Sequence, residues 1–439
     1  MTPDRIVELV RQAGVTGAGG AGFPTYAKYR NQAELVIANG AECEPLLYTD
    51  RTVMVSRAAE VTEGLSLAMR TVGAEKGVIA LKRYYRQAIQ ALKANLKPGQ
   101  EIFLLDDFYP AGDEFNLVYE VTGKVIPEGG LPLEVGVVVS NVGTLMNVAA
   151  AAAGRPVTDK FLTVNGEVGK AGVYQAPVGT AFKEVIEAAG GTELSDYAVI
   201  SGGPMMGRPV DPGKTVVTKT CSGILVLPRW HKLAGESDLE AELSRARSAC
   251  EGCRICTDLC TRYLLGHRIE PHLVVRALSY GQDEAPERLT AAFLCCQCGI
   301  CDLTACPCGL SPRALYRGVR SQFDRHGFKN IHHQKPPGPR LERSGRKISS
   351  ANIKRRLGIS KYNQELSFVR NIAEVKSVRI PLLQHIGLPA RPVVAEGSRV
   401  KKGQLLAAAP DRGLGVGVHA SLSGKVTEIN SHEIVITRT

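Results

Sequence analysis

The chain has 439 residues, with 54 Lys and Arg against 43 Asp and Glu, a formal net charge of +11 and a pI near 9.1. Hydrophobic residues make up 44% and charged residues 22%, which is typical of a folded protein of about two to four domains and excludes broad disorder. No apolar run approaches the roughly 18 residues of a membrane span, and the N-terminus lacks a secretory-signal layout. We expect a cytoplasmic protein without a transmembrane segment.

The first part of the chain is expected to alternate helices with short strands. Thr2 and Pro3 predict a helix start, and the apolar stripe that follows stops at Gly14. Strands are predicted at residues 35–38, 78–81, 102–105 and 135–139, with helices near residues 55–72 and 84–96. Strands that alternate with helices indicate a mainly parallel sheet covered by helices.

The pattern changes further along the chain. A small α+β module is indicated by predicted strands at residues 161–164, 198–201, 215–217 and 224–227 and a helix near 180–189. A helix at residues 238–249 is expected to lead into a cysteine-rich block. Residues 327–350 are rich in Pro, Gly and basic side chains, which is typical of a linker or extended arm. Short strands and Gly turns from about residue 380 indicate an all-β unit.

Ten of the twelve cysteines lie between Cys250 and Cys308. In a reducing compartment such crowding favours metal over disulfides. The two runs have the spacings C-x2-C-x2-C-x3-C and C-x2-C-x2-C-x4-C-P, in which three cysteines surround one iron–sulfur cluster and the fourth reaches the other. This predicts two [4Fe–4S] clusters, one held by Cys250, Cys253, Cys256 and Cys306, the other by Cys260, Cys295, Cys298 and Cys301.

Alternatives remain for several cysteines. Structural zinc is the competing assignment, although a triple C-x2-C-x2-C run fits poorly the two separated pairs of a zinc site. Cys296 competes with Cys295 as a ligand, and Cys308 is spare. Cys43 and Cys221 are expected to be small buried residues.

Two loops in the first part of the chain are candidates for ligand binding. Residues 17–22 read GAGGAG, whose glycines let backbone N–H groups approach a phosphate, and Lys28 adds positive charge; a plain tight turn is the alternative. The helix–loop–strand order differs from an ordinary dinucleotide fingerprint. Residues 39–45 follow a predicted strand, at the edge where open α/β sheets bind ligands. Carboxylates there suit ribose or ribityl hydroxyls; two solvated acidic residues are the alternative.

The stretches GAGGAGFPTYAK and ANGAECEP resemble the FMN- and NADH-binding subunit of respiratory NADH dehydrogenase, and more closely the cluster-bearing RnfC family. GGLP at residues 129–132, VGVVV at 135–139 and NVGT at 141–144 resemble that family too. The resemblance implies that Phe23 stacks on the nicotinamide and that Glu44 contacts NADH. It implies that residues of these loops bind FMN, namely Gly17, Gly19, Gly20, Gly22, Lys28, Asn39, Glu42, Asn141 and Thr144. Hydride transfer needs no acid–base side chain, and no catalytic residue is assigned.

Residues 394–406 and 420–426 resemble the two halves of a biotinyl/lipoyl-type barrel-sandwich hybrid. The stretch between the halves, 408–415, contains no lysine, so it cannot carry a swinging arm, and a structural or docking role is expected. In RnfC proteins this unit comes first. Its place at the end resembles the PduS-type cobalamin reductases of bacterial microcompartments, which share the run EPHLVVRA at residues 270–277.

The resemblance implies a multidomain α/β protein. Its expected parts are a Rossmann-like FMN/NADH-binding α/β domain (1–158), an SLBB β-grasp module (159–235), a helical ferredoxin-like domain with two [4Fe–4S] clusters (236–325), a basic linker or arm (326–379) and a barrel-sandwich hybrid (380–439).

The function implied is that of an NADH-dependent oxidoreductase, which passes electrons from NADH through FMN and the two clusters to cobalamin or another redox partner. The alternative is an RnfC-like electron-wiring or scaffold protein that links NAD(H) to ferredoxin, or to a shell or membrane complex, without reducing cobalamin itself. Expected partners are NAD(H), cobalamin or a cobalamin-handling adenosyltransferase, and a microcompartment shell protein or acidic redox protein. The expected location is the cytoplasm, within or at the shell of a bacterial microcompartment.

The basic charge is concentrated in one segment. Residues 313–379 hold 17 Lys and Arg against 4 Asp and Glu, whereas the rest of the chain holds 37 against 39. This basic segment directly follows the second cysteine run, where electrons are expected to leave the protein. A patch of positive charge there favours a negatively charged partner, so we expect a docking arm, with a solvated linker as the alternative. Nucleic acid is not expected, because no basic platform interleaved with aromatic residues accompanies the charge.

Overall fold

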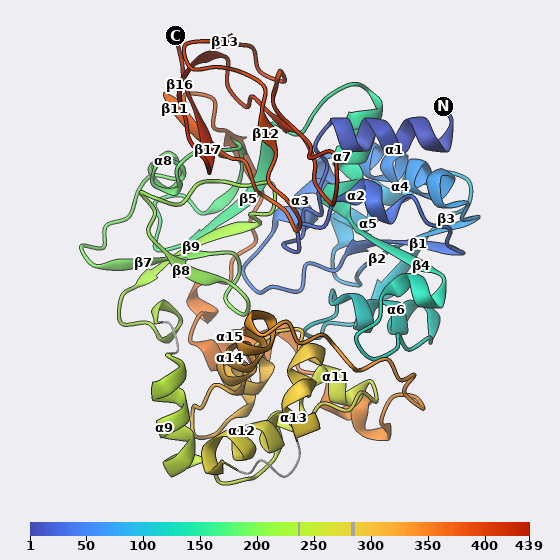
Figure 1. The fold of residues 1–439 in the computed structure, drawn as a ribbon, viewed down its shortest axis with the longest axis vertical. Helices are drawn as coiled ribbons and strands as arrows, with labels where there is room; N and C mark the ends of the chain where they lie inside the picture. The colour runs from blue at the N-terminus through green and yellow to red at the C-terminus, as the bar shows by residue number, and fades with distance from the viewer. Residues whose placement is uncertain (236–237, 282–285) are drawn as a thin grey trace.

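The computed structural model describes residues 1–235, 238–281 and 286–439. In Figure 1 the α/β region and the β-grasp sheet lie side by side, the all-β unit packs at one end and the helices that carry the cysteines pack at the other. In the part of the chain that is described, every helix is too short or too polar to cross a membrane. The predicted boundary at residue 236 lies outside the described residues, and the other domain boundaries stay predictions.

A parallel four-stranded sheet forms the α/β region, as predicted. Its strands are β1 (Leu35–Gly40), β2 (Lys76–Lys82), β3 (Gln100–Leu105) and β4 (Val137–Asn141), in the order β3-β2-β1-β4. In the pairing of β1 with β4, Asn39 lies opposite Asn141. Both asparagines therefore end at the carboxyl edge of the sheet, where open α/β sheets bind ligands.

Helices cover both faces of this sheet. They are α1 (Pro3–Gln12), α2 (Thr25–Lys28), α3 (Thr49–Ser56), α4 (Ala58–Val72), α5 (Arg86–Lys93), α6 (Glu114–Thr122) and α7 (Val142–Ala152). The expected helix near 55–72 is in fact two, because the backbone leaves the helical conformation at Arg57 (φ −133°). Helices α4 and α7 pack closely: a Cβ on Gly64 would lie 1.9 Å from the Leu145 carbonyl oxygen.

A six-stranded mixed sheet forms the β-grasp region. Its order is β10-β6-β5-β9-β7-β8, with β5 (Asp159–Gly166), β6 (Gly172–Pro177), β7 (Tyr197–Ser201), β8 (Arg208–Val210), β9 (Gly223–Pro228) and β10 (Phe368–Asn371), and α8 (Phe182–Ala188) packs on it. The predicted strand at 215–217 is wrong. The Val217 N–H donates to Thr180 O and its carbonyl accepts from Gly179 N, so this segment pairs with the loop before α8. Strand β10 comes from far along the chain and adds an edge that the sequence did not indicate.

Short helices separated by the cysteine loops form the third region. They are α9 (Leu239–Ala249), α10 (Ile255–Asp258), α11 (Thr261–Leu264), α12 (Pro271–Tyr280), α13 (Pro286–Thr290) and α14 (Pro312–Arg325). Helix α9 begins where predicted, because the Asp238 side chain accepts from Ala241 N at 2.9 Å and caps its first turn.

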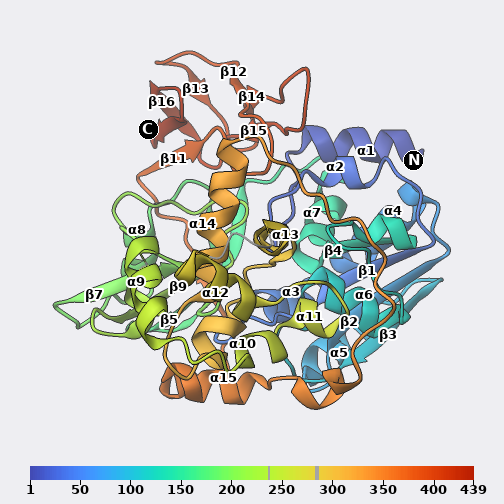
Figure 2. The same ribbon diagram turned by 60° about the horizontal axis from the view of Figure 1, so that its bottom comes forward.

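The basic segment after α14 is fastened to the α/β region. Figure 2 shows it passing beside α6 on its way to α15 (Ser350–Leu357). Arg343 and Lys347 both form ion pairs with Glu120 of α6, at 2.7 and 2.9 Å. Part of the basic charge is therefore neutralised within the molecule, which differs from a purely solvated linker.

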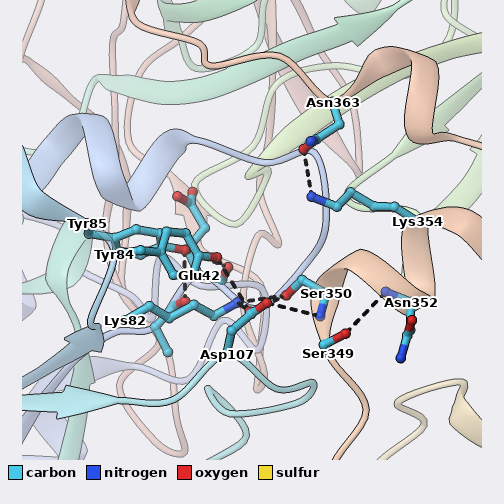
Figure 3. Close-up of polar contacts among 11 residues, drawn as sticks. Glu42, Lys82, Tyr84, Tyr85, Asp107, Ser349, Ser350, Asn352, Lys354 and Asn363 are labelled. Carbon is cyan, nitrogen blue, oxygen red and sulfur yellow. Dashed lines mark hydrogen bonds and ion pairs between the residues drawn. The ribbon is translucent and has the colours of Figure 1, made fainter.

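The start of α15 is joined to the carboxyl end of β2, as Figure 3 shows. The buried Lys82 ammonium donates to Asp107 Oδ1 at 2.9 Å and to Ser350 Oγ at 3.0 Å. The Ser350 hydroxyl in turn donates to Asp107 at 2.6 Å. This network fixes the end of the basic segment beside the edge of the sheet that carries Asn39.

The C-terminal unit consists of two small sheets. One contains β11 (Ser377–Pro381), β13 (Arg399–Val400), β16 (Gly424–Ile429) and β17 (Glu433–Thr437), and the other β12 (Arg391–Pro392), β14 (Leu405–Ala408) and β15 (Val418–His419). The unit packs against residues 17–22, here called the glycine loop: Ile386 N donates to Gly22 O at 3.0 Å. The buried Lys219 ammonium donates to Gly14 O and Gly417 O, at 2.8 and 3.0 Å, and so joins three regions.

Candidate functional site

The glycine loop folds over the first turn of α7. The Gly17 N–H donates to Phe23 O at 2.9 Å, which closes the loop, and the Ala18 N–H donates to Thr144 Oγ1 at 2.9 Å, which fixes the loop on the helix. Gly20 adopts φ +111°, a conformation that other residues rarely adopt, and a Cβ there would meet nothing within 4 Å. The loop therefore exposes backbone to open space, as a phosphate cradle requires.

The carboxyl edge of the sheet supplies fixed polar side chains. Asn141 caps α7 by accepting from Gly143 N at 2.8 Å, and its amide donates to Asp50 Oδ2 at 2.7 Å. Asn39 donates to Gly112 O at 2.8 Å. These bonds hold the amide groups in fixed orientations beside the glycine loop.

Three half-buried carboxyl groups lie at this edge. The two oxygens of Glu42 accept from the N–H groups of Asp50 and Arg51, at 2.6 and 3.1 Å, in the first turn of α3. Burial, and then the nearby Asp50 carboxylate, raise the pKa of Glu42 to about 8. Burial also raises the pKa of Asp50 to about 6 and that of Glu44 to about 7. The negative charge is therefore reduced at neutral pH, which lowers the repulsion of an anionic ligand.

These groups line one cavity of about 680 Å³. Ten of the eleven residues predicted to bind FMN or NADH line it: Gly17, Gly19, Gly20, Phe23, Lys28, Asn39, Glu42, Glu44, Asn141 and Thr144. The eleventh, Gly22, lies behind the loop, where a Cβ would be 3.2 Å from the His385 Cα. Lys28 lies at the cavity wall with its ammonium 3.0 Å from Glu114 Oε1. The size, the glycine cradle and the polar donors fit FMN with a nicotinamide beside it.

The cavity also has walls that sequence reasoning did not identify. Asp50 and Asp113 contribute from the α/β region. The β-grasp region contributes residues from two loops, namely Ser201, Gly202, Gly203, Met206, Gly207, Arg208 and Val210, and Thr218, Thr220, Cys221 and Ser222. A further wall comes from the second cysteine run, through Cys296 and Cys298. The only sequence signal for these walls is local: Asp50 lies at the start of a helix and Gly202-Gly203 precedes a turn. Of the two cysteines outside the block, Cys221 is buried as expected and Cys43 is half-buried.

The structure brings the two predicted cysteine sets around two separate small cavities. Cys250, Cys253, Cys256 and Cys306 line one, together with Cys308. Cys260, Cys295, Cys298 and Cys301 line the other, together with Cys296. Each cavity thus combines three cysteines of one run with one cysteine of the other run, which is the arrangement that crossed ligation requires.

The donor sets fit clusters better than single ions. Among the described residues, no group of three or more His, Cys, Asp or Glu side chains is placed to hold a single metal ion. The ambiguity at positions 295 and 296 stays open. The Cys295 sulfur accepts from the backbone and side-chain N–H groups of Gln297, at 3.4 and 3.3 Å, whereas Cys296 lies on the wall that faces both cavities.

Two polar connections join the 680 Å³ cavity, here called the flavin cavity, to the second cysteine set, which is Cys260, Cys295, Cys298 and Cys301. The Tyr109 hydroxyl donates to Cys298 O at 2.7 Å and lies 3.5 Å from Glu44 Oε1, while the other Glu44 oxygen accepts from Met205 N at 2.9 Å. The buried Arg262, which lines the cysteine cavity, forms a bidentate pair with Asp113, which lines the flavin cavity, with both distances 2.8 Å. The two sites are therefore held in a fixed relation.

Comparisons with known protein families assign four parts of the chain. The models matched are the Nuo51 FMN-binding domain (residues 10–150), the SLBB domain (161–209), a 4Fe-4S dicluster domain (249–311) and the RnfC barrel sandwich hybrid domain (357–439). They confirm the predicted multidomain α/β architecture and its FMN and iron–sulfur cofactors.

Similar curated proteins cover the whole chain. It is 42% identical to cobalamin reductase PduS of Salmonella typhimurium, over 100% of this chain and 97% of that protein, and 40% identical to cobalamin reductase PduS of Citrobacter freundii, over 99% and 96%. It is 37% identical to one component of the Na(+)-translocating ferredoxin:NAD(+) oxidoreductase complex of Acetobacterium woodii, over 60% of this chain and 59% of that protein. Because it is 42% identical to the first of these proteins over 97% of that protein's length, the chain belongs to the PduS cobalamin reductase family.

Proposed function

We propose that this chain oxidises NADH and passes the electrons through FMN and two [4Fe–4S] clusters to cobalamin. One observation carries the proposal: Cys296 and Cys298, from the second cysteine run, line the same cavity as the glycine loop and Asn141. A hydride acceptor and a one-electron carrier that share a wall are placed for direct electron transfer. The cobalamin acceptor is supported by the names of the two full-length relatives.

When bound, FMN supplies the change from hydride transfer to single-electron transfer. The chain's own residues bind and orient. The N–H groups of Gly19 and Gly20 would hold the phosphate, because those of Gly17 and Ala18 already donate to Phe23 and Thr144. Asn39 and Asn141 would hold the ribityl chain, since both amides are fixed at the edge of the sheet. Glu44, which is held by Met205 and Tyr109, would accept hydrogen bonds from the NADH ribose hydroxyls. Phe23 lines the cavity and would stack on the nicotinamide of NADH.

The test is an anaerobic titration of the purified protein with NADH, followed by absorbance and electron paramagnetic resonance (EPR), with cob(III)alamin then added. We expect NADH to bleach the flavin band, the EPR signals of two reduced clusters to develop, and cobalamin to reoxidise both. Reduced clusters that never react with cobalamin, yet reduce an added ferredoxin, would support the RnfC-like wiring function instead. A flavin that NADH does not bleach would contradict both.

We also propose an acidic redox protein as a docking partner, on the basis of charge. Arg317, Arg325, Lys329 and Lys335 are exposed around the end of α14, and no ion pair is found for them among the described residues. A positive patch after the cluster region attracts a negative surface. Electron transfer to an acidic ferredoxin should slow as salt rises, and the Lys329→Glu/Lys335→Glu variant should be slower at low salt. Equal rates in both proteins at low salt would refute this.

The location within or at the shell of a bacterial microcompartment stays a prediction, and so do the adenosyltransferase and shell partners. Co-fractionation of the tagged full-length protein with purified microcompartments tests the location. Recovery outside that fraction alone would contradict it.

A further inference from the structure

One buried polar group near the second cysteine set has no partner in the protein. The Tyr316 side chain on α14 is 1% exposed, and its hydroxyl has no hydrogen-bond partner among the described residues. A buried hydroxyl without a partner is costly, and native structures rarely contain one unless a ligand or water completes its bonding. The surroundings of Tyr316 therefore indicate which group accepts a hydrogen bond from its hydroxyl.

Tyr316 lines the cavity that Cys260, Cys295, Cys298 and Cys301 surround. It belongs to the apolar cluster against which Cys260 and Cys295, two of these predicted ligands, pack. No cavity described at the first cysteine set includes it.

The other polar side chains that line this cavity already have partners. Arg262 forms its bidentate pair with Asp113, and the Arg313 Nε lies 3.0 Å from Asp302. The Gln297 amide donates to the Cys295 sulfur. Within the described lining of this cavity, the Tyr316 hydroxyl oxygen is the only buried side-chain nitrogen or oxygen atom that has no hydrogen-bond partner. A phenol keeps its hydrogen at neutral pH.

We propose that the Tyr316 hydroxyl donates a hydrogen bond to a sulfur of the [4Fe–4S] cluster held by Cys260, Cys295, Cys298 and Cys301, and raises the reduction potential of that cluster. Hydrogen bonds to cluster and ligand sulfurs are among the factors that set these potentials. The reduced cluster carries one more electron than the oxidised one, so its sulfurs accept the bond more strongly; no proton moves. Because this set shares a wall with the flavin cavity, the effect favours entry of electrons from the flavin. The inference rests on the proposed cofactor sites.

The experiment is a dithionite redox titration of the full-length protein by EPR, which needs neither NADH nor cobalamin and so stands even if cobalamin is not the acceptor. Tyr316→Phe removes only the hydroxyl. Tyr280→Phe is the matched control, because Tyr280 lies in the same region with an exposed ring. We expect Tyr316→Phe to make one cluster up to about tenfold harder to reduce, a shift of about 59 mV for a one-electron couple, while the control leaves both potentials unchanged.

A ligand variant assigns the two signals. Cys253→Ser changes the ligand set of the first cluster, so the signal it alters should be the one that Tyr316→Phe does not shift. The proposal is overturned if neither potential moves, or if only the first cluster's potential moves. If Tyr316→Phe loses iron, 3-fluorotyrosine at position 316 keeps the hydroxyl and makes it a stronger donor, so the potential should rise. An unchanged or lower potential in that protein would equally overturn the proposal.

Discussion

The ion pair between Arg262 and Asp113 should carry much of the coupling between the cluster region and the flavin domain. Both side chains are largely buried, 8% and 14% exposed, and the guanidinium also stacks on Phe115 at 3.6 Å. Removing one partner leaves a buried charge, which costs about 3–5 kcal/mol. We therefore expect Arg262→Met to lower the free energy of unfolding by this amount.

A double-mutant cycle with Asp113→Asn isolates the pair. Asparagine at 113 still offers an oxygen to Asn116 N, so the cap of α6 is kept. Two charge-assisted bonds of roughly 1.5 kcal/mol each give an expected coupling near ~3 kcal/mol. The assay is anaerobic urea unfolding followed by circular dichroism and flavin absorbance, with the iron content of each variant measured first. The exposed Arg320–Asp324 pair is the control, with coupling below about 0.5 kcal/mol. A coupling below ~1 kcal/mol for Arg262–Asp113 would refute the reasoning.

Three further predictions concern the flavin cavity, the contact that Lys219 makes between three regions, and the clusters. Glu44→Gln should raise the NADH concentration needed to bleach the flavin, at unchanged iron content; loss of iron instead would count against its assignment. Burial lowers the pKa of Lys219 to about 7, so between pH 7 and its unfolded value near ~10.4 the unfolded chain binds the extra proton. Relative to Lys219→Met, the wild-type protein should therefore gain stability as pH rises through this window, by about 1.4 kcal/mol per pH unit in denaturation experiments, and parallel pH profiles would contradict this. Cys295→Ser should reduce the iron content by about half, from about eight atoms, while Cys296→Ser retains it; the reverse result would make Cys296 the ligand.

The parts of the site that were predictable from sequence are those written in short motifs. The glycine loop, Asn39 and Asn141 lie within a few residues of strand ends, so local pattern and edge position identify them. The cysteine sets follow from spacing alone. In contrast, Cys296 reaches the flavin cavity, and Ser350 reaches Lys82, only because segments more than 200 residues apart pack together. Strand β10 was missed for the same reason: its partner β6 lies about 200 residues earlier.

The α/β region, the β-grasp region and the second cysteine run together enclose the flavin cavity, so the binding of FMN and the retention of the second cluster depend on each other. Flavin that binds only the assembled walls stabilises the docked arrangement by mass action, so the melting temperature should depend on free FMN concentration. Because Cys296 and Cys298 belong both to the flavin cavity and to the second cluster loop, oxidative loss of that cluster loosens a wall of the flavin site. Oxidative loss of the cluster should therefore be followed by release of flavin. In a protein exposed to air, the brown absorbance of the iron–sulfur clusters should disappear before the yellow absorbance of bound flavin.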